Sequence, residues 1–264
     1  MLSPRILYLY FFVFCILTST VSKAQDFSNK GREFWVLFPP HAPSGGNLAN
    51  LSLYITSDKN TSGNIIINGD SIAFNINAFT PQEFILDRAS TYVSGLESAT
   101  DSDPASLQKI VINKGIKVVV DEGKPSIVVY AHMYANARSA ASIILPTSVL
   151  ERRYKTISYT QTLGSPESGE YRKSQFSVIA VEDNTTIKIQ LRKNGIASGD
   201  SYEVDLPTAG TIYSFQDNLD LTGTSIESVS KDGSQCKKIA VFSGSTSLSI
   251  GSNNSVDPLF QQSY

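Results

Sequence analysis

The chain has 264 residues, of which 22 are basic and 24 are acidic, giving a net charge of −2. This length is enough for one large domain or two small ones. Because no basic stripe runs through the sequence, we expect neither a nucleic-acid partner nor an anionic membrane partner.

The first 24 residues have the pattern of an export signal. Arg5 supplies the positive charge, Ile6 to Leu17 form an apolar segment, and Ser22 and Ala24 are the small residues that precede a cleavage site. The apolar segment is shorter than the roughly 20 residues of a membrane-spanning helix. We therefore expect cleavage between Ala24 and Gln25 and a secreted or cell-surface protein with no membrane insertion.

Short strands fill the first half of the mature chain. Leu51, Leu53 and Ile55 alternate with polar or smaller neighbours, which is the period of a strand with one buried face. Trp35, the only tryptophan, is expected to anchor the core because aromatic rings bury the most area per residue. The expected strands are Glu33–Phe38, Leu51–Ile55, Ile65–Ile67 as its hairpin partner, Ile72–Ile76 and Glu83–Leu86.

Ala89 to Pro104 is the longest stretch without periodicity, and its Ser, Thr and Asp content predicts an exposed loop. Long loops in compact domains are often functional. Asp101 and Asp103 could contribute oxygen ligands to calcium, but no glycine or distal glutamate completes a known calcium-binding loop. We therefore predict no metal or cofactor site.

A cluster of helix and strand breakers, Gly164 to Gly169, is the best internal boundary. It divides the mature chain into a first β half, residues 25–163, and a second, residues 170–264. A hairpin turn is expected at Glu182 to Asn184. The expected strands here are Lys155–Thr160, Phe176–Ala180, Thr185–Leu191, Ser201–Val204, Thr211–Phe215 and Ser225–Ser228.

One design occurs twice and indicates an internal duplication. Lys124 to Pro146 contains a buried strand, a short polar break and a second apolar run, and Cys236 to Gly251 repeats this a little over 100 residues later. Each copy follows a glycine-led strand, which begins at Gly115 in one and at Gly223 in the other. Repeats set the architecture of a chain, so we predict two halves of the same build.

The second copy lacks an obvious closing strand. Asp257 and Pro258 resemble a helix start, because Asp caps helices and Pro suits the first turn. With no strand expected before Tyr264, one sheet edge would lie open to pairing. We therefore expect the sequence to be truncated at its C-terminus or to be the front of a longer protein.

Many short strands, frequent turn residues and no long amphipathic helix predict an all-β fold. Two antiparallel sandwiches packed together fit the duplication best. A β-propeller is the alternative, although its blades repeat at a shorter period of about 40–50 residues.

Six motifs in this order resemble the N-terminal domain of the IgGFc-binding protein family: GREFWVLFP, LSLYITSDKNTSGNIIING, NKGIKVVVDEGKPSIVVYA, SVIAVEDNTTIKI, DLTGTSIES and KKIAVFSGS. The resemblance runs from about Gly31 to Tyr264. It implies a secreted, β-rich module of the kind found in an animal mucus protein and in bacterial surface proteins. It also implies an extracellular partner, immunoglobulin Fc or a mucin-like glycan. Where relatives often carry a cysteine, Ser255 to Asp257 has none, which favours a bacterial-type member.

Catalytic constellations are not evident. The sequence has no Gly-x-Ser-x-Gly, His-Glu-x-x-His, Cys-x-x-Cys or phosphate-binding loop. His41 and His132 are the only histidines, and we expect structural or exposed roles for both. Glu182 and Asp183 have the chemistry of a glycosidase pair, but turn residues are expected there for backbone reasons. We therefore predict no catalytic residues.

The lone mature cysteine, Cys236, excludes an intramolecular disulfide. Its neighbours Lys237 and Lys238 could activate the thiol, but we favour a half-buried cysteine at a strand edge.

The leading hypothesis is a non-catalytic protein- or glycan-binding adhesion module. We expect its binding residues in two loops, His41 to Asn47 and Ala89 to Pro104, because rigid β scaffolds display function on loops. A structural unit of a larger surface protein is the alternative, and a polysaccharide hydrolase is a third.

Overall fold

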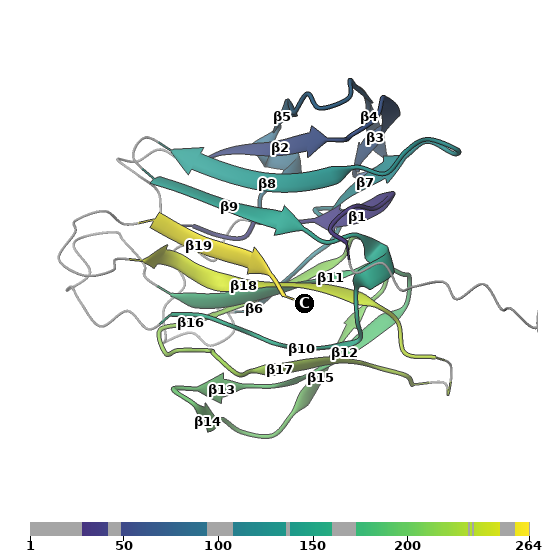
Figure 1. Ribbon diagram of the computed structural model, residues 1–264. Coiled ribbons are helices and arrows are strands. Elements are labelled where there is room, and N and C mark those ends of the chain that lie inside the picture. The colour runs from purple at the N-terminus through teal and green to yellow at the C-terminus, as the bar shows by residue number, and fades with distance from the viewer. Residues whose placement is uncertain are drawn as a thin grey trace, which may run out of the picture.

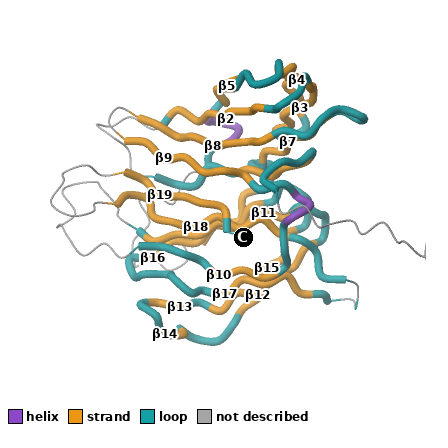
Figure 2. Tube along the Cα trace, viewed as in Figure 1, coloured by secondary structure: helices purple, strands orange, loops and turns teal. Residues whose placement is uncertain are grey.

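The structure is a computed structural model that describes residues 28–41, 49–93, 108–135, 138–159, 173–231, 233, 235–248 and 257–263 (Figure 1). The predicted export signal, the boundary at Gly164 to Gly169, and Asp101 and Asp103 lie outside these residues. Strands dominate the described part, and its helices are single turns (Figure 2). The all-β prediction is confirmed.

The first half forms two four-stranded antiparallel sheets. Sheet 1 has the strand order β1-β7-β3-β4, and sheet 2 has the order β5-β2-β8-β9. Their strands are β1 (Glu33–Val36), β2 (Asn50–Thr56), β3 (Thr61–Ile67), β4 (Asp70–Ile76), β5 (Gln82–Leu86), β7 (Ile116–Val120), β8 (Val128–Ala135) and β9 (Arg138–Ile144). The short helix α2 (Arg88–Thr91) and the 3-10 turn η2 (Thr147–Val149) complete this half.

The second half forms sheet 3, of order β19-β18-β11-β16-β6, and sheet 4, of order β10-β17-β12-β15. Strand β6 (Gln108–Val111) comes from the first half and extends sheet 3 beside β16. The other strands are β10 (Arg153–Lys155), β11 (Ser174–Ala180), β12 (Thr185–Gln190), β15 (Tyr202–Leu206), β16 (Ile212–Asp217), β17 (Ser225–Val229), β18 (Ile239–Leu248) and β19 (Asp257–Gln262), with a small hairpin of β13 (Arg192–Lys193) and β14 (Ile196–Ala197).

The two halves repeat one topology. In chain order, β1, β2, β3, β4, β5, β7, β8 and β9 correspond to β10, β11, β12, β15, β16, β17, β18 and β19. The correspondence reproduces the neighbours within each sheet, so sheet 1 is the counterpart of sheet 4 and sheet 2 is the counterpart of sheet 3. The glycine-led strands of the sequence repeat are β7 and β17.

Apolar side chains fill two cores. Sheets 3 and 4 enclose one core, which includes Phe176, Ile187 and Val241. Sheets 1 and 2 contribute to the other, which also takes in Ile179 and Phe242 from the opposite face of sheet 3. Sheet 3 is therefore covered on both faces, and it lies beside sheet 2 where β19 runs next to β9 (Figure 1).

The four sheets follow one another in a ring that resembles a four-bladed propeller, the alternative architecture. The period of the sequence repeat had favoured packed sandwiches because one propeller blade spans only about 40–50 residues. Each copy of this repeat contains two sheets, so its period is longer than that of one blade.

Both predicted hairpins are wrong in the same way. Strand β2 pairs with β5 and β8, whereas β3 pairs with β4 and β7, so the turn after Thr56 crosses from one sheet to another. The turn at Glu182 to Asn184 likewise connects β11 of sheet 3 with β12 of sheet 4. Alternating patterns locate strands, but they do not indicate which sheet a strand joins.

The prediction of a helix start at Asp257 is also wrong. Asp257 and Pro258 begin strand β19 instead of a helix, and this strand pairs antiparallel with β18. It fills the place that β9 has in the first half, so the second half has its closing strand. Pairing with β18 and burial of Phe260 outweigh the local preference for a helix start.

Candidate binding surfaces

The two loops predicted to bind a partner start from one buried base. Residues 42–48 and 94–107 lie outside the described residues, but the ends that lead into them are placed. Phe38 forms a bridge with Tyr92, and the Val93 amide donates to the Phe38 carbonyl at 3.1 Å. The starts of both loops are thus fixed side by side.

His41 connects the other residues of this base through hydrogen bonds. Its Nδ1 lies 2.9 Å from the Tyr92 hydroxyl, and its own amide donates to the same hydroxyl oxygen at 3.0 Å. The Ala49 amide donates to Nε2 at 2.8 Å, across the ends of the first loop. Because Nε2 accepts, the ring is the neutral tautomer with its proton on Nδ1. His41 is buried, and both of its ring nitrogens stabilise this base.

The second loop is shorter than the sequence indicated. Ala89 to Thr91 belong to helix α2, whose N-cap is Asp87, and Thr91, Tyr92 and Val93 are buried. The expectation of an exposed loop is therefore wrong for these residues. Tyr92 is the anchor that sequence reasoning missed, although the apolar pair of Tyr92 and Val93 interrupts the polar composition of this stretch.

His132 lies on the outer face of sheet 2, the face turned away from sheet 1. It stacks on Tyr134 with ring centroids 5.0 Å apart, and its Nε2 lies 2.8 Å from the Ser139 hydroxyl. The predicted break between the buried strand and the second apolar run does not begin after Tyr130, because β8 continues to Ala135. Alternation of Tyr130, His132 and Tyr134 was the signal for a strand with an aromatic outer face.

Glu182 and Asp183 occupy the turn between β11 and β12. Asp183 accepts a hydrogen bond from the Ala209 amide at 2.8 Å, and Glu182 accepts one from the Lys238 amide at 3.4 Å. Both carboxylates therefore fix neighbouring backbone. This is the role that turn chemistry gives to acidic residues.

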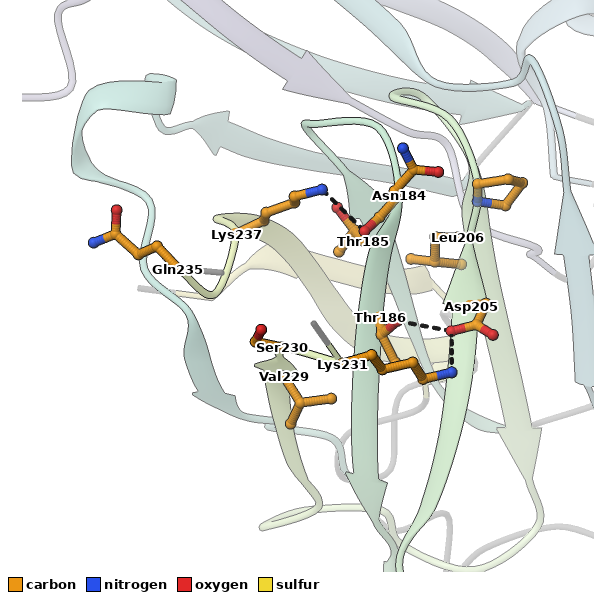
Figure 3. A pocket seen from close by; sticks show the side chains of 11 residues that line it. Asn184, Thr185, Thr186, Asp205, Leu206, Val229, Ser230, Lys231, Gln235 and Lys237 are labelled. Carbon is orange, nitrogen blue, oxygen red and sulfur yellow. Dashed lines mark hydrogen bonds and ion pairs between the residues drawn. The ribbon is translucent and has the colours of Figure 1, made fainter. Parts of the chain in front are cut away.

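An open pocket of about 450 Å³ lies at one end of sheet 4 (Figure 3). Lys231 and Thr186 both donate to Asp205, at 2.6 and 2.7 Å, and these bonds, led by that of Lys231, lower the pKa of Asp205. The ammonium group of Lys237 binds the backbone carbonyl of Asn184 at 3.0 Å. A ligand here would have to replace internal hydrogen bonds, so we assign none to this pocket.

Cys236 is half-buried and has no disulfide partner. The ammonium groups of its two neighbours are directed to backbone carbonyls: Lys237 binds that of Asn184, and Lys238 binds those of Thr147 and Ser148. The Cys236 carbonyl accepts from Arg152 Nε at 2.6 Å. Within the described chain, no cluster of three or more His, Cys, Asp or Glu side chains could hold a metal ion.

Comparison with known families gives a match to the C-terminal part of the chain. A family model described as IgGFc binding protein matches residues 140–264. This part of the chain matches the IgGFc binding protein family. The match confirms the resemblance over the whole second half, and the motifs SVIAVEDNTTIKI, DLTGTSIES and KKIAVFSGS lie inside it.

The three motifs of the first half precede the matched residues. They correspond to β1, to β2 with β3, and to β7 with β8, the counterparts of strands within the IgGFc binding match. Comparison with curated proteins and with solved structures finds no match to the chain. No described helix is long and apolar enough to cross a membrane.

Proposed function

We propose that this protein is a non-catalytic binding module of an extracellular or cell-surface protein. The family match supports a binding role, because the family is described as IgGFc binding protein. The predicted export signal supports an extracellular location. By this proposal the partner is an extracellular protein or glycan, with immunoglobulin Fc and mucins as the first candidates.

The observation that carries the proposal is the shared base of the two candidate loops. His41 and Tyr92 hold together chain segments 51 residues apart in sequence. Strands β2 and β11 begin near this base. Strands β5 and β8 of sheet 2 run antiparallel to β2, so their C-terminal ends lie near the base as well. A rigid scaffold that brings two loops to one end is the usual basis of loop-mediated recognition.

A binding screen tests the proposal directly. The mature chain is applied to immobilised immunoglobulin Fc, to mucins and to a glycan array, and saturable binding to one class is expected. Alanine substitution through His41–Asn47 and Ala89–Pro104 should then weaken that binding, whereas Glu122→Ala, in an exposed turn at the other end of β8, should leave it unchanged. A folded protein that binds nothing in the screen contradicts the proposal and favours a structural unit.

Tyr92→Phe tests the base of the loops without altering their sequence. Removing the hydroxyl leaves the buried amide of His41 without its acceptor, which costs about 1–3 kcal/mol of unfolding free energy. The expected result is a lower urea midpoint and weaker binding to the partner found in the screen. If stability falls but binding is unchanged, the loops do not take part in binding the partner.

A further inference from the structure

The internal duplication places two equivalent surfaces in one molecule. On the outer face of sheet 2, Tyr130 of β8 lies opposite Tyr54 of β2 and Ile143 of β9. At the same place in sheet 3, Phe242 of β18 lies opposite Ser177 of β11 and Gln262 of β19. In both halves the preceding residue, Val129 or Val241, points to the opposite face, into the core enclosed by that half's own two sheets.

The outer face of sheet 3 is covered by an extended segment of this same chain. Leu37 to Pro40, with the sequence LFPP, follows β1 and is fully buried or nearly so. Its Pro40 carbonyl accepts a hydrogen bond from Gln175 Nε2 at 2.8 Å, and the ring of Phe38 lies 6.4 Å from that of Phe260. Phe242 is only 1% exposed and belongs to the core that also contains Leu37 and Phe38.

The outer face of sheet 2 has no such cover among the described residues. Tyr130 is 41% exposed, whereas its counterpart Phe242 is 1% exposed. Likewise, Ile85 is 67% exposed, whereas its counterpart Gln216 is fully buried. Ile85 and Gln216 are counterparts because they lie opposite Ser52 and Gln175, which occupy equivalent positions in β2 and β11.

Aromatic rings form most of this open surface. His132 lies between Tyr54 and Tyr134, with ring centroids 6.0 and 5.0 Å away. Glu83 fixes one side, because it accepts hydrogen bonds from Ser52 at 2.7 Å and from Tyr54, and the latter bond raises the pKa of Tyr54. The surface is thus preorganised, because the rings pack side by side and hydrogen bonds fix the position of the Glu83 carboxylate next to them.

We propose that the outer face of sheet 2 binds an extended, apolar, proline-containing segment of a partner protein. Two observations indicate this occupant. The equivalent face of sheet 3 is already covered by a segment of this kind, the LFPP of residues 37–40. Surfaces lined by aromatic rings are also the sites that recognise extended proline-containing segments, whose conformation is preformed and costs little entropy to bind. This surface is a sheet face and not a loop, so it does not rest on the proposed function.

The probe is a fluorescein-labelled synthetic peptide with the sequence of residues 36–41, VLFPPH, and its control replaces both prolines by alanine. Fluorescence anisotropy with the mature chain should show saturable binding that is weaker for the control. Tyr130→Ala and Ile85→Ser should each weaken binding by about tenfold or more, as expected for truncation of an anchor side chain. Ile72→Ser, at a similarly exposed isoleucine of sheet 1, is the matched control and should bind like the wild type.

Circular dichroism and urea midpoints establish that all the variants are folded. Alanine substitutions in the loop of residues 41–47 should leave peptide binding intact, so failure of the loop proposal and failure of this one are distinguishable. Absence of peptide binding, or equal binding by Tyr130→Ala, overturns the proposal. So does a Tyr130-dependent glycan signal or a Tyr130-dependent dimer in the absence of peptide binding, because either assigns the face to another occupant.

Discussion

The two halves of the molecule share a topology but differ in how their equivalent sheets are covered. Sheet 3 is buried on both faces, and its outer face carries Gln175, Ser177, Ser214 and Gln216, all of which are buried. Sheet 2 is buried on one face only, and its outer face carries exposed tyrosine and isoleucine. The hidden face combines these polar side chains with buried apolar ones such as Phe242, and the open face is aromatic.

The buried polar groups on the covered face are not expected from burial alone, and hydrogen bonding explains them. On the covered face, Gln216 donates to Gln175 at 3.0 Å, Gln175 donates to the Pro40 carbonyl, and Ser177 and Ser214 share a bond of 2.7 Å. These bonds compensate much of the cost of burying polar groups. On the open face, hydrogen bonds join Ser52 and Tyr54 to Glu83 and His132 to Ser139, but Tyr130 and Ile85 stay exposed. Large exposed aromatic surfaces usually mark an interaction site.

The largest expected effect compares one position in the two halves. Phe242→Ala should lower the unfolding free energy by about 3–5 kcal/mol, because it leaves a cavity in the core that also contains Leu37 and Phe38. Tyr130→Ala, at the equivalent position, should cost less than about 1 kcal/mol, because the ring is exposed. Urea unfolding of the two variants measures this difference. Equal losses would mean that the outer face of sheet 2 is also covered.

A second prediction concerns Tyr154, which stands in β10 where the first half has Phe34 in β1. Burial raises the pKa of Tyr154 from 10.0 to about 12. The unfolded chain therefore ionises this group before the folded one does, and the stability that it gives below pH 10 is lost as the pH rises towards 12. The loss reaches about 2–3 kcal/mol.

Tyr154→Phe makes the second half resemble the first at this position. The variant should lose about 1 kcal/mol at neutral pH, because the Glu151 amide no longer has the Tyr154 oxygen as its acceptor at 2.6 Å. Between pH 10 and 12 its unfolding free energy should fall less steeply than that of the wild type. An unchanged slope would show that Tyr154 does not resist ionisation in the folded state.

The strands were largely predictable, but their partners were not. Period-2 alternation located β2 and β12, because it depends only on which side chains are apolar. The same alternation cannot show that the turn after β2 leads into another sheet, since strands on either side of a core look alike. Two hairpins were therefore predicted where the chain crosses between sheets.

The open aromatic face was hidden from sequence reasoning for a related reason. The strands that contain Tyr130 and Phe242 read IVVY and IAVF, and nothing in these letters distinguishes a covered ring from an exposed one. The difference arises because Phe242 packs in a core with residues that include Leu37 and Phe38, about 200 residues away in the chain. The base of the loops was missed likewise, because the contact between His41 and Tyr92 joins two segments with no pattern in common.

The smallest expected effect tests the network under the covered face. Gln175→Ala removes the donor to the Pro40 carbonyl and the acceptor of Gln216, and should cost about 1–3 kcal/mol because both groups remain buried. Its counterpart Ser52 donates only to Glu83, an exposed carboxylate that can bind water instead, so Ser52→Ala should cost less than about 1 kcal/mol. Urea midpoints of the two variants provide the measurement. A larger loss for Ser52→Ala would show that Glu83 is held by burial, and the outer face of sheet 2 would then be less accessible than its exposed tyrosines indicate.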